Sequence, residues 1–277
     1  MHILVLLKMV PDVVEELEIA SDGKALDLEY LRMIPSESDD HALEEALLLK
    51  ERHGGTLTVL ALEAPEVDDA LFAALAKGAD RALKVVGAEA GMSTREAARV
   101  LSQTIARQPG LLPVDLILTG VQAIDDLDGL IAPLVAHGLD LPFVGIVTGV
   151  SLDAAGKTVL AVKEYSGGVR GEFEATLPAV LGIQAAEKPP RYVPVAKVRT
   201  AMKTRNIDCA PAPALADGGW PVVQVMEMKR NEPAGHAEML EGDPEKVSQK
   251  LCGILAGRSP TTFRKMWRPF RFYGCCR

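Results

Sequence analysis

Short apolar runs alternate with amphipathic stretches along the first half of the chain. The amphipathic stretches repeat apolar side chains at helical spacing and lie at residues 39–53, 66–76, 94–107 and 130–138. The apolar runs predict buried strands at residues 3–7, 57–62, 82–86, 116–119 and 144–150. This order predicts right-handed crossovers, and therefore an α/β fold with a doubly wound, mostly parallel sheet covered by helices on both faces. Ligands of such sheets bind beyond the carboxyl ends of the strands.

The helix expected at residues 39–53 has the clearest pattern of polar and apolar faces. Ser38 or Asp39 can cap its start, and Gly54 follows its end. The inward stripe is formed by Ala42, Leu43, Ala46, Leu47 and Leu49. The side chains expected to stay in water are Glu44, Glu45, Lys50 and Glu51.

The alternation of apolar runs with amphipathic stretches ends after Pro142. Alternating strands, turning at Gly156 and Gly167, predict an antiparallel extension that includes residues 159–162 before the strand at 179–183. Residues 187–257 are rich in Pro and Ala and predict a long C-terminal arm without its own core, followed by a short helix at 244–255. We expect three parts: an α/β domain (1–186), this arm (187–257), and a basic, aromatic tail (258–277).

Composition, net charge and cysteine spacing argue against several classes of function. The chain has 277 residues, of which 48% are hydrophobic and 4% aromatic, with a formal net charge of -8. This charge argues against nucleic acid as a partner, because nucleic-acid binding relies on cationic contacts with phosphates. The four cysteines form no C-x-x-C pair, so no metal site is expected and reduced thiols in the cytoplasm are favoured. The apolar N-terminal run ends at Lys8 and predicts a core strand, not a signal peptide.

The strongest candidate for a ligand site is the loop 120–131, which joins a predicted strand to a helix. Such a turn presents backbone N–H groups and a helix N-terminus to a negative group, although a solvated acidic loop is the plainer interpretation. Its three aspartates could suggest a hard cation, but the spacing fits no EF-hand. Walker A, G-x-G-x-x-G and G-x-S-x-G sequences are absent, and the five scattered histidines suggest no triad. We therefore expect no catalytic residues.

The segment PPRYVPVAKVRTAMK (189–203) exposes apolar and basic residues together in a stretch stiffened by proline. It is interpreted equally well as a linker or as a docking element for another protein.

An ordered set of motifs resembles the beta subunit of electron transfer flavoproteins, the family that includes FixA. The set comprises MHILVLLKMVPD, ALEEALLLKE, AALAKGADRAL, DLILTGVQAIDD, KEYSGGVRGEFEATLPAV and PPRY, with EGDPEKVSQKL near the C-terminus. Each motif alone is weak, but their order and spacing are specific. The resemblance implies an adenine nucleotide alpha hydrolase-like fold.

The resemblance also implies a heterodimer with a larger alpha subunit that holds the redox-active FAD. A flavin-dependent dehydrogenase would reduce this carrier, and an acceptor such as a quinone oxidoreductase would reoxidise it. The beta subunit of most relatives also holds AMP. Partner-binding positions carried over from the family are Glu164, Arg191, Tyr192 and Val195. The cofactor-binding positions carried over are Leu6, Ser36, Asp39, Glu63, Gly120, Gln122, Ala123, Asp125, Asp126, Asp128, Gly129, Leu130 and Ile131.

The loop departs from the family's usual A-I-D-D-D-T-G-Q-V-G-P, because this chain reads A-I-D-D-L-D-G-L-I-A-P. Asp128 stands where a threonine is usual and Leu130 where a glutamine is usual, while Glu37 adds a charge in the altered N-P-Y-D segment. These changes bring like charge to a phosphate and remove a donor, so AMP is expected to be weakly held or absent. Backbone N–H groups from Asp128 to Ile131 are expected to remain open to the ligand.

Two other functions compete with this one. A stress-type protein that senses adenine nucleotide would share the fold, but it would carry a Gly-rich phosphate loop and no long C-terminal arm. An enzyme of the nucleotide alpha hydrolase group would need a Gly-rich pyrophosphate loop after the first strand, where this chain has MVPDVVEE.

Overall fold

The computed structural model describes residues 1–88, 92–153, 155–215, 225–230 and 239–258. They form two compact units, Met1–Met228 and Lys229–Arg277. The second unit contributes one described helix, α6 (Pro244–Arg258), close to the predicted one. The basic tail lies outside the described residues from 259 onward. Along the described parts, no helix combines the length and apolar character needed to cross a membrane.

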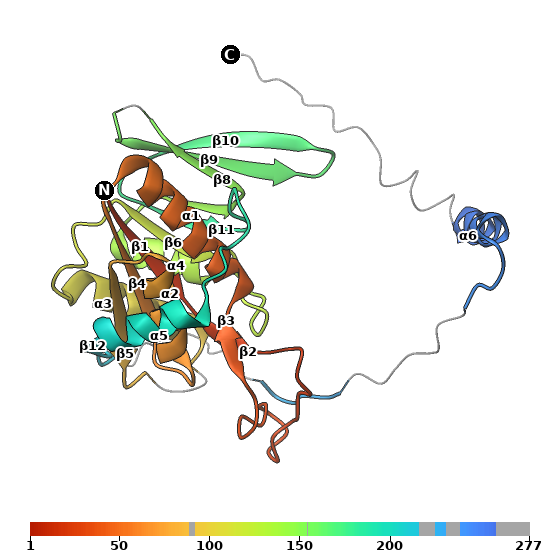
Figure 1. Ribbon diagram of the computed structural model, residues 1–277, viewed down its shortest axis with the longest axis horizontal. Coiled ribbons are helices and arrows are strands. Elements are labelled where there is room, and N and C mark those ends of the chain that lie inside the picture. Colours follow the sequence, from red (N-terminus) through yellow and green to blue (C-terminus); the bar gives the residue numbers. More distant parts are fainter. Residues whose placement is uncertain (89–91, 154, 216–224, 231–238, 259–277) are drawn as a thin grey trace. The chain divides into compact units, whose positions relative to one another are not determined.

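A seven-stranded parallel sheet forms the centre of the first unit (Figure 1). Its strand order is β12-β5-β4-β1-β6-β11-β7. The strands are β1 (His2–Leu7), β4 (Thr56–Leu62), β5 (Arg81–Val86), β6 (Leu116–Gly120), β7 (Phe143–Val147), β11 (Ala179–Ile183) and β12 (Asp208–Pro211). Because the chain continues from β1 to β4 on one side and reaches β6 on the other, the strand order reverses beside β1. The doubly wound parallel fold predicted from the sequence is confirmed.

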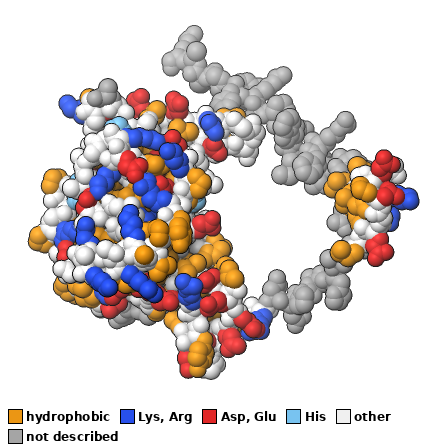
Figure 2. Space-filling model, viewed as in Figure 1, with side chains coloured by type: hydrophobic (Ala, Val, Ile, Leu, Met, Phe, Trp, Pro, Cys, Tyr) orange, Lys and Arg blue, Asp and Glu red, His pale blue; other side chains and the backbone are white. Residues whose placement is uncertain are grey.

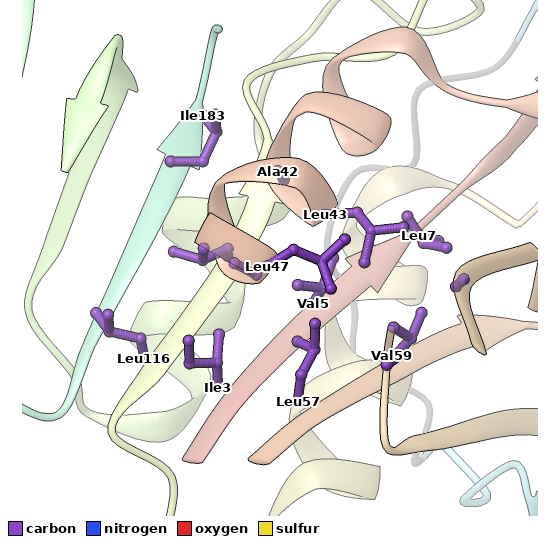
Figure 3. Packing of buried hydrophobic residues seen from close by; sticks show 14 of the residues in the cluster. Ile3, Val5, Leu7, Ala42, Leu43, Leu47, Leu57, Val59, Leu116 and Ile183 are labelled. Carbon is purple, nitrogen blue, oxygen red and sulfur yellow. The ribbon is translucent and has the colours of Figure 1, made fainter. Parts of the chain in front are cut away.

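Helices cover both faces of this sheet. They are α1 (Glu37–His53), α2 (Val67–Lys77), α3 (Thr94–Arg107), α4 (Ile131–Leu139) and α5 (Val195–Thr204). Alternate residues of β1 face opposite layers, because Ile3 and Val5 pack in the cluster with α1 and α2, whereas Leu4 packs in the cluster with α3 and α4. Figure 3 shows the first layer, in which Leu43 and Leu47 of α1 lie over the sheet.

The antiparallel extension is also confirmed, as a separate three-stranded sheet in the order β10-β9-β8. Its strands are β8 (Gly149–Leu152), β9 (Thr158–Tyr165) and β10 (Val169–Thr176), and a short pair of strands is formed by β2 (Met9–Pro11) and β3 (Met33–Pro35). The single strand predicted at 144–150 is wrong. Ile146 has a φ of 60°, and the chain there passes from β7 in the main sheet to β8 in the small one.

Two details of α1 differ from the sequence analysis. The helix starts after Ser36, not after Ser38 or Asp39, so Asp39 lies within its first turn. Glu44 and Glu45 are buried, although they were expected in water. The reason is tertiary: the segment that follows β11 crosses this face of α1 and supplies hydrogen-bond donors to both carboxylates.

The start of the expected arm is more structured than its composition indicated. Residues 195–204 form α5, which packs against α2, and residues 208–211 form β12, which pairs in parallel with β5. Ala201 and Ala210 are buried in these contacts. The inward face of this segment consists of isolated small residues such as Ala201 and Ala210, so no repeating apolar pattern marked it in the sequence.

Candidate functional site

The candidate site lies beyond the carboxyl ends of β1 and β6, next to the point where the strand order reverses. The chain leaves β1 at Lys8 and leaves β6 at Gly120, and the first turn of α1 lies between these exits. Ligands of open parallel sheets bind at this position. The structure therefore brings together the exits of β1 and β6 and the start of α1, which are far apart in the sequence.

Asp39 joins the three segments. Its Oδ2 accepts a hydrogen bond from the Lys8 backbone N at 2.8 Å, and its Oδ1 accepts one from the Gly120 backbone N at 2.6 Å. Burial raises the pKa of Asp39 to about 7, although both backbone donors act in the opposite direction. Asp39 is therefore committed to the two strand exits, and this is a structural role beside the cofactor role that the resemblance implies.

Ser36 and Ser38 lie beside Asp39. Ser36 is buried, and the Ser38 Oγ donates to the Gln122 carbonyl oxygen at 2.6 Å. Gly120 has no room for a side chain, because an added Cβ would lie 2.7 Å from the Asp39 backbone N. The first turn of α1 thus packs directly on the start of the candidate loop.

Lys8 is a site residue that the sequence analysis missed. Its Nζ lies 2.7 Å from Asp125 Oδ1 and 2.6 Å from Asp126 Oδ2. Burial lowers the pKa of Lys8, but the hydrogen bonds to both aspartates outweigh that effect and raise the pKa overall. The signal in the sequence was a single lysine directly after the first strand, at the edge where the loop was expected.

The rest of the loop binds its own backbone. Asp128 Oδ1 accepts from the Leu130 backbone N at 3.0 Å, and the Asp128 backbone N donates to Asp126 Oδ1 at 3.4 Å. The expectation that the N–H groups from Asp128 to Ile131 stay open is therefore wrong for Asp128 and Leu130. Gly129 supports the turn with a φ of 62°.

These contacts bear on whether a nucleotide phosphate fits the loop. A phosphate at a helix N-terminus needs free backbone N–H groups and a net positive field. Here aspartates take two of the N–H groups and the nearest ammonium, and Leu127 and Leu130 expose apolar side chains. The residues present do not fit a tightly bound phosphate.

The remaining predicted cofactor positions lie on or near the same edge of the sheet. Leu6, near the end of β1, and Ala123, within the loop, are buried, and Ile131 is the first residue of α4. Glu63 directly follows β4, and its Oε2 accepts from the Gly87 backbone N at 2.7 Å. Within the described residues, no three His, Cys, Asp or Glu side chains are grouped as a metal-ligand set.

The predicted partner positions lie elsewhere on the first unit. Tyr192 and Val195 are strongly exposed. Glu164 lies on β9, where its Oε1 is 2.8 Å from Arg170 Nη2. Arg191 differs from these residues, since its guanidinium is bound to α1 within this chain. Figure 2 shows apolar and charged side chains interspersed on one face of this unit.

The family match and the similar proteins all indicate the same family. Residues 26–214 match the family described as "Electron transfer flavoprotein domain". The electron transfer flavoprotein subunit beta of Methylophilus methylotrophus is 30% identical over 266 residues, which is 92% of this chain and 98% of that relative. The corresponding subunit of Bacillus subtilis is 28% identical, covering 92% of this chain and 97% of its own length. FixA of Azotobacter vinelandii is 34% identical over 65% of this chain and 64% of its own length.

Proposed function

Because the chain belongs to the electron transfer flavoprotein family and resembles its beta subunits, we propose that it is the beta subunit of a heterodimeric electron transfer flavoprotein. Its partner is an alpha subunit that holds FAD. The heterodimer carries electrons from flavin-dependent dehydrogenases to an acceptor such as a quinone oxidoreductase. The flavin supplies the redox chemistry, and this chain supplies orientation and docking surface.

The observation that carries this proposal is the extent of the match. The relatives named as beta subunits align over nearly their whole length, including the segment after β11 and the region of α6. A nucleotide-binding domain of another function would match the sheet and its helices but would not need these C-terminal segments.

The surface of the segment 188–205 supports a docking role. This segment contains six basic residues and no acidic one, although the whole chain has a net charge of -8, and of the six Arg191 is paired with Glu44 and Glu51 of α1. Tyr192, Val195 and Met202 expose apolar side chains on it. Apolar anchors surrounded by charge of one sign are suited to a transient partner, because the charge accelerates encounter while the anchors give specificity.

The candidate nucleotide site has a reduced role in this proposal. Since Asp126 and Asp128 bind the loop's own backbone, the loop 120–131 keeps its fold without a phosphate, and AMP is weakly held or absent. The competing stress-type function requires a nucleotide on this chain, and these contacts argue against it.

Coexpression with an electron transfer flavoprotein alpha subunit tests the proposal. We expect a yellow complex that copurifies with one FAD per heterodimer, whereas this chain alone should be colourless or poorly soluble, because its docking surfaces lack their partner. A stable, yellow monomer, or no association with any alpha subunit, would refute the assignment.

A further inference from the structure

The segment that leaves β11 is tied to α1 before it reaches the exposed docking residues. The Ala186 backbone N donates to His41 Nδ1 at 3.2 Å, and the Glu187 backbone N donates to Glu45 Oε2 at 2.9 Å. Two successive backbone groups of the segment are thereby fixed to two side chains of a helix that is itself packed on the sheet.

The third attachment is the strongest. Glu44 has a side chain only 4% exposed, and within the described residues Arg191 alone supplies the donors to its carboxylate. The Arg191 backbone N and Nε lie 2.9 Å from Glu44 Oε2, and Nη2 lies 2.8 Å from Oε1. Arg191 Nη1 also reaches Glu51 Oε1 at 2.6 Å. The hydrogen bonds to Glu44 and Glu51 raise the pKa of Arg191 above its usual value.

This geometry fixes more than a side chain. Because Glu44 binds both the guanidinium and the backbone N–H of Arg191, it sets the path of the main chain at that residue. Of the next residues, Val193 packs against the core, whereas Tyr192 is 83% exposed and Val195, the first residue of α5, is 60% exposed. The two exposed apolar side chains therefore begin one residue after the attachment.

Net stability is a poor explanation for this ion pair, in which the Glu44 side chain is buried but the Arg191 side chain is 30% exposed. A buried pair gains little over apolar residues of similar volume, because its charges lose their hydration. Its distinctive property is that several directed hydrogen bonds accept only one arrangement. That property matters where an exposed segment must be held ready for a partner, since pre-ordering lowers the entropy cost of binding.

Resting on the docking function proposed above, we propose that Glu44 is a positioning residue: through Arg191 it holds Tyr192 and Val195 in the orientation in which they contact the redox partner. The occupant of this surface is a flavin-dependent dehydrogenase with an apolar socket and an acidic rim. Glu44 itself is too buried to touch that partner.

The first test measures the order of the segment in the complete heterodimer. Glu44→Gln keeps the size of the side chain but removes its charge. Asp68→Asn is the matched control, because it removes one carboxylate from a separate ion pair, with Lys84 at 2.7 Å. Hydrogen–deuterium exchange of residues 186–195 should accelerate about tenfold or more in Glu44→Gln and stay unchanged in Asp68→Asn. Unchanged exchange in Glu44→Gln would overturn the positioning role.

The second test measures docking. With a dehydrogenase that reduces the wild-type heterodimer, stopped-flow flavin reduction at several concentrations separates the second-order rate constant from the limiting rate. Glu44→Gln should lower the second-order constant about tenfold and leave photochemical reduction of the flavin unchanged. In a Val195→Ala background the same substitution should have little further effect, because the anchor it positions is already removed.

The outcomes separate the two proposals. Equal losses from Glu44→Gln with and without Val195 would show that Glu44 acts independently of the anchor, and would overturn the inference while the electron-carrier function stands. If no dehydrogenase reduced the wild-type heterodimer, the proposed function would fail and the docking role of Glu44 would fail with it.

Discussion

Restoring the family's usual side chains in the loop should restore tight AMP binding. The variant is Asp128→Thr combined with Leu130→Gln in the heterodimer. In the structure, Asp128 Oδ1 accepts the Leu130 backbone N–H at 3.0 Å, which is a group that a phosphate would use. The threonine removes the competing charge, and its neutral hydroxyl competes less strongly than a carboxylate for the Leu130 N–H, while the glutamine adds a donor.

The size of the effect follows from these contacts. A carboxylate that a phosphate must approach or displace costs on the order of 1–3 kcal/mol, and a missing donor costs a similar amount. Asp128 is exposed, so solvent screening places its share at the lower end of this range. The sum still exceeds about 1.4 kcal/mol, which corresponds to at least tenfold in affinity.

The assay denatures each purified heterodimer and quantifies the released nucleotide. We expect little AMP from the wild type and close to one equivalent from the double variant. Asp153→Asn is the control, because Asp153 likewise binds turn N–H groups, those of Lys157 at 2.7 Å and Thr158 at 2.9 Å, in a loop remote from the site. One equivalent of AMP in the wild type would refute the reasoning.

Three further predictions concern stability and assembly. Burial raises the folded pKa of Asp39 to about 7. The free energy of unfolding is therefore highest below the unfolded pKa of this carboxyl group and falls as the pH rises to about 8. This loss amounts to up to about 4 kcal/mol; urea unfolding should show it in the wild type, and Asp39→Asn should abolish that pH dependence. Gly120→Ala should destabilise by about 1–3 kcal/mol in thermal unfolding, since its Cβ would crowd Asp39, whereas Gly253→Ala meets no atom within 4 Å and should not. Deleting residues 258–277, nearly all outside the described part, should leave heterodimer formation intact in copurification; lost assembly would show that the tail is structural.

Elements with a long repeating pattern could be predicted from the sequence. The strands β1, β4 and β6 are mostly apolar runs, and α3 combines helical spacing with a capping box between Ser93 and Glu96. Local pattern is sufficient in these cases because burial requires many apolar side chains in register. α5 and β12 carry too few such positions, and only their contacts with α2 and β5 define them.

The site, like the fold, could be predicted only where the sequence carries a local pattern. The loop 120–131 could be placed at the carboxyl edge of the sheet from the strand that precedes it, whereas Asp39 was implicated as a cofactor position only through the family resemblance. The ion pairs of Lys8 with Asp125 and Asp126 could not be predicted, since they join residues more than a hundred positions apart. The burial of Glu44 was missed for the same reason, because its partner Arg191 lies on a segment without periodicity.

The helix α1 supports both the candidate nucleotide loop and the segment that contains Arg191. Asp39, in the first turn of α1, holds the candidate nucleotide loop, and Glu44 and Glu51, farther along the same helix, hold Arg191. The core side chains of α1, including Ala42, are buried independently of either attachment. Since a helix fixed by its own buried face does not need a ligand at its first turn to stay in place, the loop can lose AMP without releasing the docking segment. The proposed docking role and nucleotide binding therefore rest on separate attachments to α1.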